Sequence, residues 1–236
     1  MSKRIAKKLL LIGWDSADWK IINPLLDAGK MPALEKLINN GVIGNLATLD
    51  PPLSPVLWTS IATGKRADKH GILGFVEPDP EIGGIRPVNV TSRTCKAIWN
   101  ILNQNNMKSN VIAWWPSHPA EPINGIMVSN YYQKIDTNET EKWFMSEGTI
   151  HPEERRNEFF KLRVHFSELT GDIIQPFVPN LAKINQEEDT RVGNIARFIA
   201  QSSSIHAAAT RAMRTTDWDF TRSEERRVGK ECATLC

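Results

Sequence analysis

The sequence predicts an α/β domain with a mainly parallel sheet flanked by helices. Apolar runs typical of buried strands alternate with amphipathic helical segments from residue 8 to about residue 130. The composition, 41% hydrophobic and 24% charged, is that of an ordinary globular protein. A chain of 236 residues is also long enough to bury a sizeable core.

The first strand and the helix after it are marked clearly. "KKLLLIGWD", residues 7–15, is a continuous apolar run that ends in a carboxylate, which predicts a parallel strand buried on both faces. "MPALEKLINNG" follows, and it predicts a helix that begins near Pro32 and ends at Asn40 and Gly41.

The next segments continue the alternation. "VIGNLATL", residues 42–49, predicts a second strand, and residues 55–63 predict a short helix closed by Gly64. "TSRTCKAIWNILNQNN" predicts another amphipathic helix. "KSNVIAWW" and "INGIMVSNY" predict two further strands.

The texture of the sequence changes after residue 134, which suggests a division of the chain. Residues 1–134 are expected to form the amino-terminal part of the α/β domain, and residues 135–205 a mostly helical cap or insertion without strands. Residues 206–221 are expected to return to the core, with a strand start at "WDF". The stretch from 187 to 217 predicts one long helix or two.

The last segment, residues 222–236, is an odd end for a domain because seven charges fall within ten residues where a core strand should continue. Its stretch "RSEERRVGKEC" resembles the translation of a common sequencing adapter rather than a protein family. We therefore expect a non-native tail after Thr221 and a chain whose carboxyl-terminal part is missing. Cys232 and Cys236 would then carry no biological meaning. The alternative is a natural solvated tail.

Charge and hydropathy exclude several function classes. A net charge of +2 gives no signal for binding to nucleic acid or a membrane surface. No stretch approaches the ~20 apolar residues that span a bilayer, and the basic start lacks the long apolar run of a signal peptide. The three cysteines form no disulfide framework or metal-knuckle spacing. The expected location is the cytoplasm.

Asp15 is the first candidate site residue. It stands at the carboxyl end of the first predicted strand, the edge at which open α/β sheets bind ligands. A carboxylate there suits a divalent metal ion. The alternative is that Asp15 or Ser16 only caps the next helix, and Asp18 is expected in the first turn of that helix.

Ser54 is the second candidate. Serine at the N-cap with Pro55 after it is a common helix start. The same geometry favours an anion, and a hydroxyl at this place is suited to attack phosphorus if a metal ion lowers its pKa. From position alone, the cap and the nucleophile both remain open. Among the histidines, His70 in "KHGI" is expected to pack or hydrogen-bond at a turn.

Taken together, "LLLIGWDSADW" and "LSPVLWTSIATGKRADKHGILGF" resemble the amino-terminal half of the alkaline phosphatase superfamily. The resemblance is greatest to the type I phosphodiesterase/nucleotide pyrophosphatase branch and its predicted phosphohydrolase/phosphomutase relatives. It covers residues 8 to about 130 well and is looser over 135–205. "TTDWDF" resembles the strand that leads into further metal-ligand motifs.

This resemblance implies metal-dependent hydrolysis of a small-molecule phosphate ester, a phosphomonoester or phosphodiester, through a phosphoserine intermediate. Two divalent ions, often zinc, would be held in part by Asp15 and by Ser54, which matches the nucleophile. Leu57 stands where the nucleotide pyrophosphatases carry an asparagine, so a monoester, a diester, a phosphonate and a sulfate all stay open as substrates.

The family's remaining metal ligands are expected after "WDF", and none precedes the tail. A catalytic zinc normally takes three protein ligands, so we expect the chain as given to be inactive although its intact parent is an enzyme. Two alternatives remain: a non-catalytic binding or scaffold protein with this fold, and a phosphomutase of the same superfamily.

Overall fold

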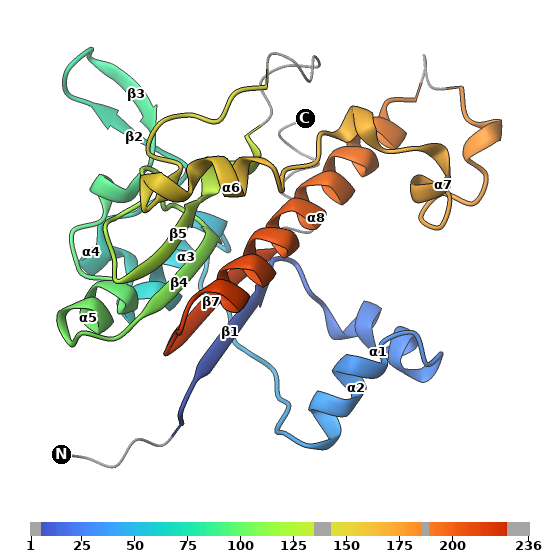
Figure 1. Ribbon diagram of the computed structural model, residues 1–236, viewed down its shortest axis with the longest axis horizontal. Helices are drawn as coiled ribbons and strands as arrows, with labels where there is room; N and C mark the ends of the chain where they lie inside the picture. The colour runs from blue at the N-terminus through green and yellow to red at the C-terminus, as the bar shows by residue number, and fades with distance from the viewer. Residues whose placement is uncertain (1–5, 135–142, 186–188, 226–236) are drawn as a thin grey trace.

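The computed structural model describes residues 6–134, 143–185 and 189–225. Its centre is a five-stranded sheet (Figure 1). Three parallel pairings join the first four strands, and the last strand is antiparallel to its neighbour. In spatial order the strands are β1 (Leu9–Trp14), β7 (Phe220–Glu225), β4 (Ser109–Trp114), β5 (Gly125–Ser129) and β6 (Ile150–His151). The prediction of an α/β fold with a mainly parallel sheet is confirmed.

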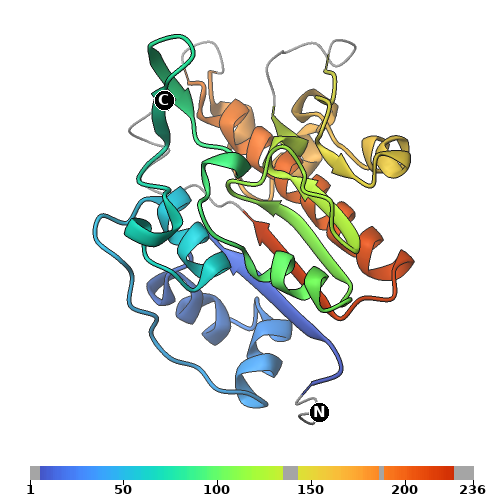
Figure 2. The ribbon, with the colours of Figure 1, turned by 90° about the vertical axis from the view of Figure 1, so that its left-hand side faces the viewer.

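Helices cover both faces of this sheet (Figures 1 and 2). On one face, α3 (Ser54–Thr63) and α5 (Ile98–Gln104) contribute Trp58 and Trp99 to a core that includes Trp114 of β4. On the other, α8 (Arg191–Thr215) packs its small residues against β4 and β5 in a second core. The sheet is therefore the middle layer of three.

The prediction that the first strand is buried on both faces is wrong. Leu9, Leu10 and Ile12 of β1 are 54%, 45% and 55% exposed. The cause is the place of β1 at the edge of the sheet, where within the described chain it pairs only with β7. The α3 layer reaches β1 at Gly13, which is buried beneath Trp58.

The expected strand at 42–49 is absent from the structure. This segment forms no regular element, and Val42 and Leu46 are 99% and 89% exposed. A strand needs a hydrogen-bonded neighbour, and no described strand pairs with these residues. The helix before it, α2 (Pro32–Asn39), ends at Asn40 as predicted.

A further helix, α1 (Trp19–Asp27), precedes α2. Asp18 does not lie in its first turn, as expected, but is its N-cap, and its carboxylate accepts a hydrogen bond from the backbone N–H of Lys20 at 2.8 Å. This bond satisfies one of the N–H groups that a helix start leaves without an intrahelical partner.

Several short elements follow α3. α4 (Ala67–His70) ends at Gly71, whose φ of 83° is left-handed and suits glycine. A hairpin of β2 (Val76–Asp79) and β3 (Gly84–Pro87) was not predicted from the sequence. The helix expected in 91–106 is reduced to α5, because residues before it form a separate turn, η1 (Val90–Ser92).

The region expected as a helical cap, 135–205, consists of short pieces up to residue 183 and of the first part of the long helix α8, in the residues that the structure describes. Two-residue β6 is a strand where none was expected. α8 is a single helix that continues past residue 205, and the expectation for 135–142 and 186–188 lies outside the described residues. The short pieces are η4 (Glu153–Arg155), α6 (Arg156–Phe160), η5 (Phe166–Glu168), α7 (Gly171–Ile174) and η6 (Leu181–Lys183), and η2 (Asn130–Gln133) directly precedes the region.

The strand predicted to start at "WDF" begins at Phe220 and continues to Glu225, so it includes the first residues of the adapter-like stretch. Arg222 is fully buried there, and its guanidinium lies 2.6 Å from the ring centre of Trp114 and 4.7 Å from that of Trp99. A charged side chain thus occupies the middle of an aromatic core. The rest of the expected tail, 226–236, lies outside the described residues.

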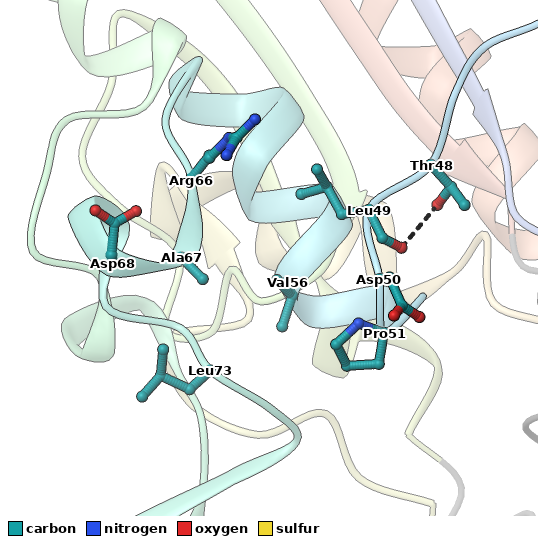
Figure 3. Close-up of a pocket in the computed structure, with 9 residues that line it drawn as sticks. All are labelled: Thr48, Leu49, Asp50, Pro51, Val56, Arg66, Ala67, Asp68 and Leu73. Carbon is teal, nitrogen blue, oxygen red and sulfur yellow. Dashed lines mark hydrogen bonds between the residues drawn. The ribbon is translucent and has the colours of Figure 1, made fainter.

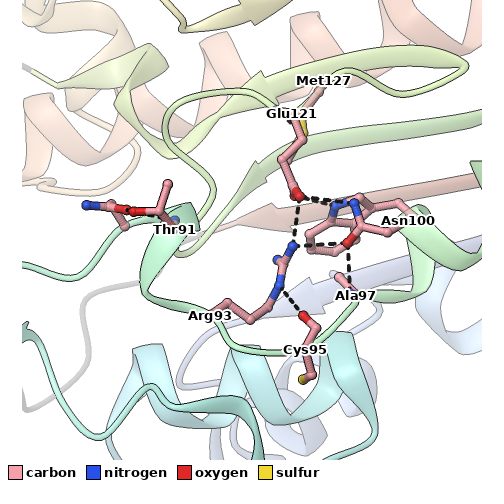
Figure 4. A network of polar contacts seen from close by, with 9 residues as sticks. Thr91, Arg93, Cys95, Ala97, Asn100, Glu121 and Met127 are labelled. Carbon is pink, nitrogen blue, oxygen red and sulfur yellow. Dashed lines mark hydrogen bonds and ion pairs between the residues drawn. The ribbon is translucent and has the colours of Figure 1, made fainter.

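One polar cluster ties the loops around α5 together (Figure 4). The carboxylate of Glu121 accepts hydrogen bonds from Arg93 at 2.8 Å, from the indole of Trp99 at 2.7 Å and from the amide of Asn100 at 3.0 Å. The side chain of Arg93 is only 6% exposed. These bonds satisfy groups that would be costly to bury alone.

Candidate active site

Asp15 and Ser54, the two site residues predicted from the sequence, lie side by side. Asp15 follows the last residue of β1, and Ser54 is the first residue of α3. The Ser54 hydroxyl donates a hydrogen bond to Oδ2 of Asp15 at 3.3 Å, which is long for an O–H···O contact. Both line a hollow of about 370 Å³, called here the Ser54 hollow. Leu49, Leu57, Trp58 and Ser60 also line it.

The expectation that Ser54 is the N-cap of its helix is wrong. Leu53 occupies that position with extended backbone, and it provides no capping side chain. Ser54 itself is the first helical residue, is 5% exposed, and donates its hydroxyl hydrogen to Asp15. The helix ends as predicted, at Gly64 with a φ of 65°.

The packing of Trp58 fixes where the helix starts relative to β1. The indole of Trp114 on β4 donates to the backbone carbonyl of Trp58 at 3.1 Å, and the two rings meet edge to face with centres 4.8 Å apart. On the other side the ring of Trp58 lies over Gly13, where a Cβ would come within 2.7 Å. Gly13 precedes Asp15 by two residues, and Trp58 lies on the helix that begins at Ser54. The contact between Gly13 and Trp58 therefore fixes the positions of Asp15 and Ser54 relative to each other.

His70 does not line the Ser54 hollow but hydrogen-bonds to Ser60, which does. Its Nδ1 accepts from the backbone N–H of Ile72 at 3.1 Å, so Nε2 carries the proton and donates to the Ser60 hydroxyl at 3.0 Å. Ser60 in turn donates to the carbonyl of Val56 at 2.8 Å. Burial lowers the pKa of His70 and keeps the ring neutral. The sequence predicted a turn histidine here but not that Ser60 is its partner.

A metal ion would find two oxygen donors at this place, Asp15 and Ser54. Hard or borderline divalent ions take such ligands, but a catalytic zinc normally has three from the protein. Within the described ranges, no group of three or more His, Cys, Asp or Glu side chains could hold an ion. The described residues therefore supply part of a metal site and not a whole one.

The remaining histidines lie elsewhere. His118 stacks on Tyr131 with ring centres 4.0 Å apart, and its Nδ1 is 3.1 Å from the Ser129 hydroxyl. His151 contacts the carbonyl of Ile123. None of these groups lines the Ser54 hollow. In the part of the chain that the structure describes, no helix is long and apolar enough to cross a membrane.

A hydroxyl at a helix start, beside a carboxylate at the carboxyl edge of a parallel sheet, is an arrangement suited to phosphoryl chemistry. Comparison with family models agrees with it. Residues 9–221 match the type I phosphodiesterase/nucleotide pyrophosphatase family, and the chain belongs to this family of phosphohydrolases within the alkaline phosphatase superfamily. The matched region ends at Thr221, one residue before the adapter-like stretch.

Solved structures share the fold. Phosphonoacetate hydrolase from Sinorhizobium meliloti 1021 superimposes with a TM-score of 0.57 in its phosphonoformate complex and 0.55 in its phosphonoacetate complex. Sequence identity is 15%, and the match covers 93% of this chain but 46% of the hydrolase. The chain thus spans less than half the length of these neighbours. Among curated proteins, no sequence gives a significant match.

Proposed function

We propose that this chain is the amino-terminal part of a metal-dependent phosphohydrolase in which Ser54 is the nucleophile and Asp15 a metal ligand. The observation that carries the proposal is the contact between the Ser54 hydroxyl and the Asp15 carboxylate at 3.3 Å, in a chain of this family. The hollow around them gives a substrate access to the hydroxyl.

In the proposed step, Oγ of Ser54 forms a bond to phosphorus while the bond from phosphorus to the leaving oxygen breaks. The leaving oxygen departs with the electron pair of that bond, and the hydroxyl proton passes to water on the side of Asp15. Bound divalent metal would lower the pKa of the hydroxyl and neutralise charge on the phosphoryl group. Water then attacks the phosphorus of the serine adduct, which restores Ser54 and releases phosphate from a monoester substrate or a phosphomonoester from a diester.

The position of Ser54 at the start of α3 supports the same step. The positive end of the helix dipole lies at Ser54, where negative charge develops on the phosphoryl oxygens. The hydrogen bonds from His70 through Ser60 to the carbonyl of Val56 hold the first turn in place. Phosphate esters and phosphonates both present such a group, and the solved neighbours hold phosphonates.

The test uses the protein encoded by the uninterrupted reading frame that contains residues 9–221. With Zn²⁺ added, we expect turnover of 4-nitrophenyl phosphate or bis(4-nitrophenyl) phosphate, and an acid-quenched phosphate adduct on the peptide that carries Ser54. Ser54→Ala abolishes both signals, and Asp15→Asn lowers Zn²⁺ affinity in calorimetry. Ser203→Ala, an exposed serine on α8, is the matched control.

Other outcomes separate the alternatives. Wild-type turnover by Ser54→Ala would overturn the assignment of the nucleophile. An intact protein without turnover would favour the binding or scaffold alternative, and transfer of phosphate to a second hydroxyl of the substrate would favour a phosphomutase. Because the described residues supply only part of a metal site, we propose that the 236-residue chain alone is inactive.

A further inference from the structure

A second and larger hollow, whose lining residues Figure 3 shows, shares part of its lining with the Ser54 hollow. Its volume is about 530 Å³, and it is named here the Arg66 hollow. Three parts of the chain form it: the segment 48–51 that leads into α3, Val56 on α3 itself, and the residues around α4. From the last part come Arg66, Ala67, Asp68 and Leu73.

The two hollows share a wall. Thr48 and Leu49 line both of them, and Val56 of the Arg66 hollow is two residues from Ser54. A molecule with its phosphoryl group at Ser54 that reached the Arg66 hollow would pass Thr48 and Leu49, because these two residues line both hollows. The part of the substrate in the Arg66 hollow would then be the leaving group, which the bond that breaks joins to phosphorus.

The lining of the Arg66 hollow has a distinct chemistry. Leu49, Val56 and Leu73 provide apolar surface. Arg66 is the only cation among the lining residues, and its side chain makes no ion pair or hydrogen bond with any residue that the structure describes. In Figure 3 the guanidinium extends from the start of α4 toward the side of Leu49.

Two carboxylates restrict where an anion can bind. Asp68 contacts Lys69 at 3.6 Å and lies at the end of the hollow away from Leu49 (Figure 3), and Asp50 lines it near Pro51. Both repel a negative group. The planar guanidinium of arginine, in contrast, matches the two oxygens of a carboxylate or phosphate.

We propose that the Arg66 hollow binds the leaving group of the substrate, and that Arg66 selects leaving groups that carry a second anion on a small apolar body. The inference rests on the proposed attack by Ser54, since this attack defines which part of the substrate leaves. The chemical class is a phosphate ester of a carboxylate-bearing or phosphate-bearing alcohol. Arg66 acts here as a specificity residue and takes no part in bond breaking.

Turnover is compared in the intact protein with 4-carboxyphenyl phosphate and phenyl phosphate, which differ only in the second anion. We expect kcat/KM to favour the carboxylated ester by about tenfold, as for one well-oriented charged hydrogen bond. Arg66→Met brings the ratio close to one. Lys65→Met is the matched control: Lys65 is the residue before Arg66 and carries the same charge, but it does not line the hollow. This variant should leave the ratio of the two kcat/KM values unchanged.

Binding is measured separately, in the 236-residue chain, by NMR titration with 4-hydroxybenzoate and with phenol. These probes carry no phosphate, so their binding depends on neither Ser54 nor a metal. We expect 4-hydroxybenzoate to shift the Nε–H signal of Arg66 and the amide signals of Leu49 and Leu73, with little effect of phenol on Arg66.

The outcomes distinguish the two proposals. Shifts at Arg66 without turnover in the intact protein would overturn the proposed function and leave the anion site standing. Equal kcat/KM for the two esters, or a ratio that survives Arg66→Met, would overturn the role of Arg66. Absence of shifts at Arg66 with 4-hydroxybenzoate would overturn it as well.

Discussion

Gly13 of β1 lies directly against the indole of Trp58 on α3, and a Cβ on Gly13 would come within 2.7 Å of two ring carbons. Real Cβ atoms do not approach other atoms this closely, so either the ring or the strand has to move. The contact matters for the site because Trp58 lies on the same helix as Ser54, and Gly13 lies near the end of the strand that Asp15 follows.

Gly13→Ala is therefore expected to destabilise the protein by about 1–3 kcal/mol, as overpacking of a core does. Urea unfolding measures the change. Gly44→Ala is the matched control, because no atom lies within 4 Å of a Cβ built there. Adding Trp58→Phe to Gly13→Ala should recover part of the loss, and equal stability of Gly13→Ala and wild type would contradict the contact.

Glu121→Ala is expected to lower the free energy of unfolding by about 2–4 kcal/mol, because it leaves the buried charge of Arg93 and the indole N–H of Trp99 without their acceptor. Chemical denaturation checks this. Glu77→Ala breaks an ion pair to Arg86 of the same 2.8 Å length on the more exposed hairpin, and it should cost about 1 kcal/mol or less. Similar losses in the two variants would contradict the role of burial.

Acid should destabilise the protein through His70. Burial lowers the pKa of His70, and burial followed by the charge of Lys134 lowers that of His118. The unfolded chain then binds more protons than the folded one, so this stability is present above about pH 6.5 and is lost as pH falls through the lowered pKa values.

The measurement is the thermal midpoint from about pH 7.5 down to about pH 5. His70→Gln keeps a hydrogen-bond donor for Ser60 but has no titrating ring, so its midpoint should fall less than that of wild type. His206→Gln, at an exposed position of α8, is the control and should follow wild type. If the thermal midpoint of His70→Gln fell with pH as steeply as that of wild type, His70 would not contribute to the acid destabilisation.

Arg222→Met should raise the thermal midpoint. Arg222 is fully buried between the rings of Trp99 and Trp114, where a charge keeps little of its hydration. Methionine keeps the unbranched apolar stem of arginine without its charge, so the variant avoids the cost of removing a charge from water. A lower midpoint in Arg222→Met would show instead that the guanidinium is a stabilising part of this core, and so count against a non-native origin for residue 222.

The neighbouring site pair could be predicted because its signals are local. An apolar run that ends at Asp15, and a serine before proline at residue 54, both mark ends of elements. In a parallel sheet with its helices, such ends gather at one edge. Whether Ser54 is the N-cap of α3 could not be predicted from the neighbouring sequence, because it depends on the backbone conformation of Leu53.

Other features depend on partners far away in the sequence. The exposure of β1 follows from its position at the sheet edge, which is set by pairing between residues such as Leu9 and Phe220. Residues 42–49 have the composition of a strand, but none of the described strands pairs with them. The contact between Ser60 and His70, and the hollow that Leu49 and Arg66 both line, form only when α4 packs beside α3.

The position of β7 has a consequence for how the chain is made. It follows all other described strands in the sequence, yet it lies between β1 and β4. Among the strands that the structure describes, β7 is the one that pairs with β1, so this pairing forms only after residues 220–225 have left the ribosome. Pairings between such distant segments form slowly, and unpaired apolar strands attract chaperones and other chains while they wait. During translation, residues Leu9 to Ile12 are therefore exposed long before the segment 220–225 that pairs with them is made.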